Sequence, residues 1–443
     1  MNRQRFGKTS KRVCYGTELL QAIGRCLPRR GLALQVADGR RRWTPRMLVT
    51  CAILFAWLPG RAAKDVFETA RDAVVGLYPT RRRPGRRHQG FLEALATGSR
   101  ELLTVVCGAL QAGVRRLYGG TWRFMGWVVM GVDGSRVECP MTAANEAAFG
   151  CAGKKKTTPQ LMLTVLFHVA SGLPWAWRRG GGKESERKHL RELIGCLPRA
   201  SLLLADAGFT GYELLRALMD AGHDFIVRVG RNVRLLRQLD YDVERHDGIV
   251  YLWPKGKRSQ PPLVLRLVEV GRGRKKVHLV TSVLSRERLS DTQIGGLYRL
   301  RWGVEVLYRS FKRTMEHHKM RSDSPRHALV ELDWAMVGLW MLGLMTLQAM
   351  GPRRRQSHRW SVAESLRVVL RAVHKPRSPR RGGPLQKKLR KAVIDSYVRR
   401  RPKKARHWPH RKTEKPPGKP ILRMATKSEV LAAKPLLELK LTG

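Results

Sequence analysis

Apolar residues recur with helical spacing through the first part of the chain. Three segments carry the pattern: "GTELLQAIGRCL" at 16–27, "AKDVFETARDAVVGLY" at 63–78 and "LLTVVCGALQAGVRRLY" at 102–118. The basic stretch "TRRRPGRRHQG" at 80–90 interrupts them, as expected of a turn that contains proline and glycine. Residues 1–122 are therefore predicted to form a helical N-terminal domain.

From residue 126 the pattern changes to short apolar runs, which are typical of strands, with helical segments between them. The predicted strands are "GWVVMGVDGS" at 126–135, "LMLTVLFHVAS" at 161–171, "LPWAWRRG" at 173–180, "SLLLAD" at 201–206 and "DFIVRVG" at 224–230. Helices are predicted after the third and fourth of these runs. Such an order predicts an α/β fold with a mixed sheet and flanking helices.

Residues 231–289 break this alternation. They contain short strand-like runs such as "GIVYLWP" and "PLVLRLVEVG" and no helical pattern, so they are predicted to be a β-rich insertion. A helix is expected to begin near Ser290 and Asp291, because both are favourable N-cap residues. The central domain, with its insertion, is predicted to span residues 123–350.

The segment "YRLRWGVEVLYRSFK" at 298–312 carries two faces if it is one helix. At about 100° per residue, its polar and aromatic side chains share one stripe: Tyr298, Arg301, Glu305 and Lys312. An apolar face, able to pack on a core, is predicted on the other side: Leu300, Val304, Leu307 and Phe311. The alternative is an ordinary surface helix with a solvated charged face.

Charge changes the picture of the whole chain. Lys and Arg number 87 against 34 Asp and Glu in 443 residues, a formal net charge of +53. Such a chain repels itself unless a polyanion lies alongside, and nucleic acid is the first expectation. An anionic membrane is the rival, but the two longest apolar stretches, 47–60 and 334–350, are better explained as buried helices. No membrane partner is expected.

The N-terminus is basic and leads into no apolar segment, so no signal peptide is expected and the predicted location is the cytoplasm, associated with the nucleoid through DNA. Seven scattered cysteines without a C-x-x-C pair argue for reduced thiols. Residues 351–443 mix Lys and Arg with Pro and Gly and are predicted to be a basic, flexible C-terminal region. Such a region would add phosphate contacts that weaken as salt rises.

Two aspartates occupy equivalent places in the predicted sheet. Asp133 ends the run "WVVMGVD" and Asp206 ends "SLLLAD". Active sites of open α/β sheets gather beyond the carboxyl ends of strands, so both acids and Glu305 could converge on hard divalent cations. Taken singly, each Asp has a structural alternative: a turn at "VDGS", and a helix cap for Asp206.

The spacing Y-(2)-R-(3)-E-(6)-K at 298–312 resembles the signature of the insertion-sequence-four family of DDE transposases. Two further blocks are similar to the family's regions around its first and second catalytic Asp: "DGSRVECPMTAANEAAFG" at 133–150 and "ADAGFTG" at 205–211. The three blocks stand in the family's order, which makes a chance match less plausible. The resemblance covers residues 126–345.

The resemblance implies a ribonuclease-H-like catalytic core with a β-rich insertion between the second Asp and the Glu. Asp133, Asp206 and Glu305 would be the catalytic triad and would hold two Mg²⁺ or Mn²⁺ ions. The enzyme would cut DNA at transposon ends and join those ends to target DNA. Pairing two ends implies a homodimer in the synaptic complex, and the helical domain 1–122 would bind DNA.

The same resemblance implies that three residues of the stripe hold the phosphates of the transposon end: Tyr298, Arg301 and Lys312. Trp302 stands beside the stripe, where it could stack on an unpaired base or simply pack. Two rival functions remain open. One is a non-catalytic, domesticated DNA-binding protein, and the other is a nuclease on the same core.

Overall fold

The computed structural model describes residues 14–28, 32, 42–60, 62–78, 83–152, 157–231, 233–237, 248–254, 261–271, 276–351, 360–374, 384–394 and 418–442. The chain packs into two compact units. Unit 1 comprises Met1–Leu117, Glu138–Ala148 and Arg309–Ile394, and unit 2 comprises Tyr118–Val137, Phe149–Tyr308 and Asp395–Gly443. Each unit combines segments far apart in the sequence. The division into three consecutive domains, with boundaries at residues 122 and 350, stays a prediction.

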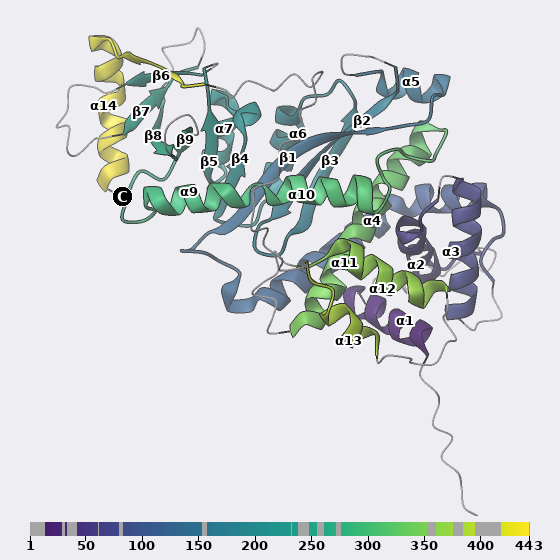
Figure 1. The fold of residues 1–443 in the computed structure, drawn as a ribbon. Coiled ribbons are helices and arrows are strands. Elements are labelled where there is room, and N and C mark those ends of the chain that lie inside the picture. Colours follow the sequence, from purple (N-terminus) through teal and green to yellow (C-terminus); the bar gives the residue numbers. More distant parts are fainter. Residues whose placement is uncertain are drawn as a thin grey trace, which may run out of the picture. The chain divides into compact units, whose positions relative to one another are not determined.

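Unit 1 is built from helices, as the N-terminal pattern predicts (Figure 1). They are α1 (Tyr15–Cys26), α2 (Pro45–Trp57), α3 (Ala63–Leu77), α4 (His88–Tyr118), α5 (Ala143–Phe149), the π-helical turn η5 (Ser310–Thr314), α11 (Pro325–Met350), α12 (Val362–His374) and α13 (Leu385–Arg390). The N-termini of α2 and α11 are capped alike. The Thr44 hydroxyl accepts from the backbone N–H of Met47, the Ser324 hydroxyl accepts from that of His327, and a proline opens each helix.

Helix α11 forms the core of unit 1. Trp57 of α2 donates its indole N–H to the carbonyl of Gly338 at 2.8 Å, and a Cβ at Gly338 would lie 2.7 Å from the Ala56 Cβ. The two helices thus approach closely at a glycine. Among the described helices α11 is long and apolar enough to span a membrane, but 94% of its apolar window is buried inside the protein. The prediction of two buried helices at 47–60 and 334–350 is confirmed.

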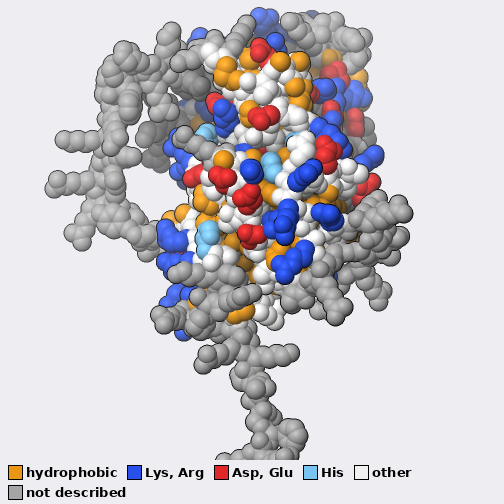
Figure 2. All heavy atoms as spheres, turned by 90° about the vertical axis from the view of Figure 1, so that its right-hand side faces the viewer, with side chains coloured by type: hydrophobic (Ala, Val, Ile, Leu, Met, Phe, Trp, Pro, Cys, Tyr) orange, Lys and Arg blue, Asp and Glu red, His pale blue; other side chains and the backbone are white. Residues whose placement is uncertain are grey.

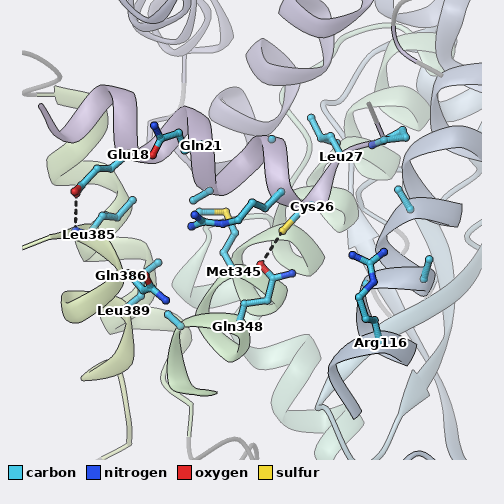
Figure 3. A pocket seen from close by; sticks show the side chains of 18 of the residues that line it. Glu18, Gln21, Cys26, Leu27, Arg116, Met345, Gln348, Leu385, Gln386 and Leu389 are labelled. Carbon is cyan, nitrogen blue, oxygen red and sulfur yellow. Dashed lines mark hydrogen bonds between the residues drawn. The ribbon is translucent and has the colours of Figure 1, made fainter. Parts of the chain in front are cut away.

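A cavity of about 1120 Å³ lies in unit 1, lined by residues of α1, α4, α11 and α13 (Figure 3). Two hydrogen bonds border it, from the Cys26 thiol to Gln348 and from the backbone N–H of Leu385 to Glu18. None of the predicted site residues lines this cavity. All seven cysteines lie in the described residues and none is in a disulfide, as predicted.

Unit 2 is a sheet with helices (Figure 1). Its strands are β1 (Val128–Glu138), β2 (Gln160–His168), β3 (Leu173–Gly181), β4 (Ser201–Ala205), β5 (Asp224–Val229), β6 (Arg234–Arg237), β7 (Ile249–Leu252), β8 (Leu263–Val270), β9 (Val277–Thr281) and β10 (Ile421–Met424). Its helices are η1 (Gly119–Thr121), α6 (Glu186–Leu193), η2 (Ile194–Cys196), η3 (Ala207–Phe209), α7 (Tyr212–Asp220), α9 (Asp291–Leu300), α10 (Gly303–Arg309) and α14 (Lys427–Thr442). The mixed α/β prediction is confirmed.

The strand order among the described residues is β10-β6-β7-β8-β9-β5-β4-β1-β2-β3. Strand β4 pairs in parallel with β1 on one side and with β5 on the other, and β2 pairs with β3 in antiparallel. From β5 onward β9, β8, β7 and β6 continue in antiparallel pairs. The β-rich insertion predicted at 231–289 therefore extends the central sheet. Its residues 232, 238–247, 255–260 and 272–275 lie outside the described part of the chain.

Helix α9 covers one face of the central strands (Figure 1). Ile294 and Leu297 of α9 belong to the same buried cluster as Leu202 and Leu204 of β4. Successive strand side chains point to opposite faces, so the equally buried Leu203 faces the other side of the sheet. Helix α9 starts with a capping box between Ser290 and Gln293, as predicted from Ser290.

The prediction of a C-terminal region without regular structure is wrong for much of residues 351–443. Helices α12 and α13 pack in unit 1, β10 pairs in parallel with β6, and Ala433 of α14 is fully buried in a cluster with Tyr251 and Val264. The high charge of the segment obscured short amphipathic runs. The remaining parts, 352–359, 375–383 and 395–417, lie outside the described residues, and so does most of the longest basic run.

Figure 2 shows one face of the molecule. Its described Lys and Arg side chains stand beside Asp, Glu and hydrophobic side chains, so this part of the face is not uniformly basic.

Candidate active site

The register of the central sheet places two aspartates at the same level. Gly131 of β1 pairs with Leu204 of β4. Asp133 within β1 and Asp206 directly after β4 each follow two residues later, so the two aspartates stand at the same level of these adjacent parallel strands.

The local structure at each aspartate differs from the alternatives that its sequence suggested. Asp133 lies within β1, which runs on to Glu138, so "VDGS" is strand and not a turn. Asp206 follows β4 directly, and its side chain makes no capping hydrogen bond, while Gly211 precedes α7. Neither acid is explained by a turn or a cap.

The motif segment is not one continuous α-helix, which corrects the helical wheel. Helix α9 ends at Leu300, a tight turn follows at Arg301 and Trp302, and α10 begins at Gly303. A Cβ at Gly303 would lie 2.5 Å from the ring of Phe167 in β2, so the start of α10 is pressed against the sheet. Val304 and Leu307 are buried as predicted, but Leu300 is 51% exposed because the break turns it outward.

Arg301 lies at the centre of the polar side chains despite this break. Its guanidinium donates to Glu305 Oε1 at 3.0 Å and lies 4.0 Å from Asp133 Oδ2. It also stands 5.7 Å from the centroid of the Tyr298 ring, while the Tyr298 hydroxyl donates to Asp206 Oδ1 at 3.4 Å. One guanidinium and one phenol thus connect the three predicted acids.

Burial makes this cluster electrostatically strained. It raises the pKa of the Asp133 carboxyl to about 6, and the negative charges of Glu186 and Glu305 act in the same direction, against the Gly134 N–H and Arg301. Burial also raises the pKa of Tyr298 to about 12, so the phenol stays protonated and able to donate. The carboxylates therefore favour additional positive charge.

Residues 128–341 match the family described as "Transposase DDE domain". This part of the chain is therefore similar to a DDE transposase domain and is called the transposase domain below. The chain is also 27% identical over 323 residues to the transposase InsG for insertion sequence element IS4 of Escherichia coli (strain K12), a match covering 66% of this chain and 72% of that protein. The resemblance predicted from the three sequence blocks is confirmed.

Among solved structures, the piggyBac transposase synaptic complex with hairpin DNA is similar at a TM-score of 0.39 and 10% identity. That match covers 87% of this chain and 85% of the other.

The transposase domain contains two site residues that sequence reasoning missed. Tyr308 of α10 is buried, and its hydroxyl lies 2.9 Å from the carbonyls of both Asp133 and Leu163, so it fixes α10 to β1 and β2. Glu186, the first residue of α6, lies against Gly134. A glutamate in the first turn of a helix looks like an ordinary partner of the helix dipole, and only the fold reveals its neighbours.

Two of the predicted DNA-contacting residues of the transposase domain do not follow the single helical stripe on which they were predicted. Trp302 is 56% exposed at the turn, so more than half of its side-chain surface faces solvent, and its stacking on a base stays a prediction. Lys312 lies in the π-helical turn η5 of unit 1, where the 100° wheel does not apply. Burial lowers the pKa of Lys312, and the charge of Glu138 opposes that shift. Its shared stripe with Glu305 stays a prediction.

The chemical type of the clustered side chains suits a hard divalent cation. Three carboxylates from β1, the end of β4 and α10 face one guanidinium, and oxygen ligands are those that Mg²⁺ and Mn²⁺ prefer. The described side chains do not form a group of three or more acids, histidines or cysteines close enough to hold a metal. Arg301 stands between Asp133 and Glu305 instead, so an ion between them would require its guanidinium to move.

Proposed function

We propose that this chain is a transposase that cuts DNA at the ends of an insertion sequence and joins those ends to target DNA. One observation carries the proposal. Within the transposase domain, Asp133, Asp206 and Glu305 come from three separate elements to one polar cluster around Arg301. The position of β1 between β4 and β2 supports a ribonuclease-H-like core.

In this proposal the three acids would hold two Mg²⁺ or Mn²⁺ ions. When bound, these ions supply activation of the attacking oxygen and stabilisation of the leaving oxygen. Asp133 fits this role because its carboxyl is buried and lies near the negative charges of Glu186 and Glu305, so a nearby cation would stabilise its ionised form. Tyr308 and the pairing of β1 with β4 hold the acids in place.

The proposed reaction has two steps, cleavage at the transposon end and joining to target DNA. In the first, a water oxygen loses a proton and bonds to phosphorus, and the bond from phosphorus to the 3′-oxygen breaks. That oxygen gains a proton, which leaves a 3′-hydroxyl and a 5′-phosphate. In the second, that hydroxyl bonds to a phosphorus of target DNA and releases a target 3′-oxygen, so one phosphodiester replaces another.

Arg301 and Tyr298 are proposed to bind the phosphates of the transposon end. The Arg301 Nε is buried and has no hydrogen-bond partner among the described residues, so a donor remains for a phosphate. Lys312 is proposed to add a phosphate contact and Trp302 to stack on an unpaired base. We further propose a homodimer on paired ends, acting in the cytoplasm on the nucleoid.

The test is a cleavage and strand-transfer assay on a plasmid that carries the element's own ends, with DNA binding measured in parallel. Wild type is compared with Asp133→Ala and Glu305→Ala. Asp220→Ala, which removes a 68% exposed acid at the end of α7, serves as the control. With Mg²⁺ or Mn²⁺, wild type and the control should nick and join DNA. Both site variants should lose at least a hundredfold in rate while still binding DNA.

Each other outcome selects a different function. Site variants that cut like wild type would show that the acids are structural. A wild-type protein that binds DNA without cutting it would favour the domesticated DNA-binding protein, and cutting without joining would favour a nuclease.

A further inference from the structure

A tight turn just before β1 presents two apolar side chains to solvent in unit 2. Phe124 is 40% exposed and Met125 is 45% exposed. The backbone N–H groups of Phe124 and Trp127 each donate to the other residue's carbonyl, at 2.7 and 2.9 Å, so residues 124–127 close a two-residue hairpin. Phe124 and Met125 are called the apolar tip below.

The backbone of the apolar tip is strained. Met125 has a φ of +48° and Gly126 has a φ of +89°, and hairpin turns with two positive φ values favour Asn-Gly or Asp-Gly. A methionine fits the first position poorly because its Cβ crowds the backbone there. Strained residues cluster at functional sites, where the surrounding structure holds them in place. The stability of the turn therefore does not explain a methionine at position 125.

Side-chain hydrogen bonds hold the apolar tip in one position. Arg123 donates to the carbonyl of Gly126 at 2.6 Å and to that of Arg199 at 3.2 Å. The side-chain amide of Gln293 donates to Met125 Sδ at 3.4 Å. Gln293 belongs to the capping box of α9, so the tip is fixed to the start of the helix whose far end carries Tyr298.

Arginines surround the apolar tip and lack acidic partners. Arg123, Arg199 and Arg288 are exposed, and the Arg288 guanidinium stands 4.5 Å from the centroid of the Trp127 ring. Within the described part of the chain, none of these three arginines forms an ion pair with an acid. The nearby Asp224 accepts a hydrogen bond from the Trp127 indole at 2.7 Å instead. The positive charge at this turn is therefore complementary to a polyanion.

A rigid apolar wedge beside arginines is an arrangement that suits duplex DNA, because the arginines hold phosphates while the wedge presses between base pairs. The position of the tip also fits a duplex. Asp133 lies six residues after Trp127 along β1, which corresponds to about 20 Å at about 3.3 Å per residue. That length equals the rise of about six base pairs. A duplex held at Arg301 and lying along α9 would therefore reach the tip.

We propose that the apolar tip is a second DNA contact of this chain. It presses against a base step of the transposon-end duplex, about six base pairs from the cleaved bond, while the three arginines hold phosphates. This inference rests on the proposed function, because it assumes that the transposon end is held at Arg301. The alternative occupant of the apolar tip is a second copy of the chain.

Fluorescence of 2-aminopurine, which increases when a base is unstacked, tests the inference without relying on cleavage. The full chain in EDTA is mixed with a transposon-end duplex that carries the probe at successive positions around the sixth base pair. Wild type is compared with Phe124→Ser and Met125→Asn. The matched control is Met141→Asn, which changes a methionine that is 74% exposed and has no positive φ.

Wild type and Met141→Asn should increase the fluorescence near the sixth base pair. Phe124→Ser and Met125→Asn should lose this increase and bind the duplex about fivefold more weakly or worse. Asn accepts a positive φ, so Met125→Asn should also raise the Tm by about 1–2 °C. Weaker binding by a more stable variant cannot come from misfolding.

The arginines have a separate readout. Arg288→Ala should lower the slope of log affinity against log salt concentration by about one, as expected for the loss of one phosphate contact. An unchanged slope overturns the role of Arg288 in the inference.

The remaining outcomes separate the inference from the proposed function. If the tip variants bind and unstack the duplex like wild type, the inference is overturned and the proposed function stands. If they keep DNA binding but turn a dimer into a monomer in light scattering, the tip binds a second copy and the inference is again overturned. If wild type binds no transposon-end DNA, both the inference and the proposed function are wrong.

Discussion

At the scale of single residues, the ionised form of Asp133 lowers the stability of the folded protein, and this effect depends on pH. Its pKa is raised from 3.8 to about 6 in the folded protein, chiefly by burial. The folded state therefore binds this proton more tightly than the unfolded state. The resulting stabilisation is complete below about pH 4 and is lost as pH rises through about 6.

Replacing Asp133 by Asn removes that dependence. In EDTA, Asp133→Asn should increase the free energy of unfolding by about 2 kcal/mol at pH 8 and change it little at pH 4, since one pKa unit corresponds to about 1.4 kcal/mol and the side chain keeps some contact with water. Urea unfolding at the two pH values measures this. Asp220→Asn is the control and should show no such difference. Destabilisation by Asp133→Asn at pH 8 would contradict the raised pKa of Asp133 in the folded protein.

The residues that could be predicted from sequence are those whose role follows from local pattern. Asp133 and Asp206 each end an apolar run, and equivalent positions on two parallel strands meet. Glu186 and Tyr308 could not be found in this way, because their roles depend on contacts with Gly134 and with the carbonyl of Asp133 across the fold.

At the scale of elements, the break between α9 and α10 sets the position of Glu305. Gly303 lets the start of α10 lie close to Phe167, because any larger residue at this position would place its Cβ against the Phe167 ring. The helical wheel could not foresee this approach or the π-helical turn that follows, since both depend on packing. Strands and capped helix starts were predicted more reliably, because alternation and N-cap residues are local signals.

A pair of glycines tests this element. Gly303→Ala should destabilise the protein by about 1–3 kcal/mol through overpacking, and it should slow DNA cleavage by displacing Glu305. Gly296→Ala in α9 has open space around the added methyl group and should stabilise by about 0.5–1 kcal/mol. Urea unfolding and the cleavage assay measure both effects. Equal effects of the two changes would show that the contact with Phe167 is unimportant.

At the scale of the whole molecule, the C-terminal part belongs to the folded sheet. Ala433 of α14 is fully buried, whereas Leu431 two residues earlier is 72% exposed. The sequence did not reveal this packing, because a charged and proline-rich context dominates the composition of residues 351–443. Strand β10 pairs with β6, and Ala433 of the following helix packs with Tyr251 and Val264 of the same sheet.

Substitutions in α14 should separate a packed helix from an unattached one. Ala433→Glu places a charge among Tyr251 and Val264 and should destabilise by about 3 kcal/mol. Leu431→Glu should change stability by no more than about 0.5 kcal/mol. Urea unfolding followed by circular dichroism is the measurement. A tolerated Ala433→Glu would mean that α14 does not pack on the sheet.

The pairing of β10 with β6 also has a consequence for biosynthesis. Strand β6 leaves the ribosome long before β10, so during translation its outer backbone groups have no partner from this strand. An unpaired strand edge is a template for pairing with another chain. A ribosome that terminates before residue 421 would therefore release a protein in which the three acids of the proposed site are all present but whose sheet is left open to aggregation.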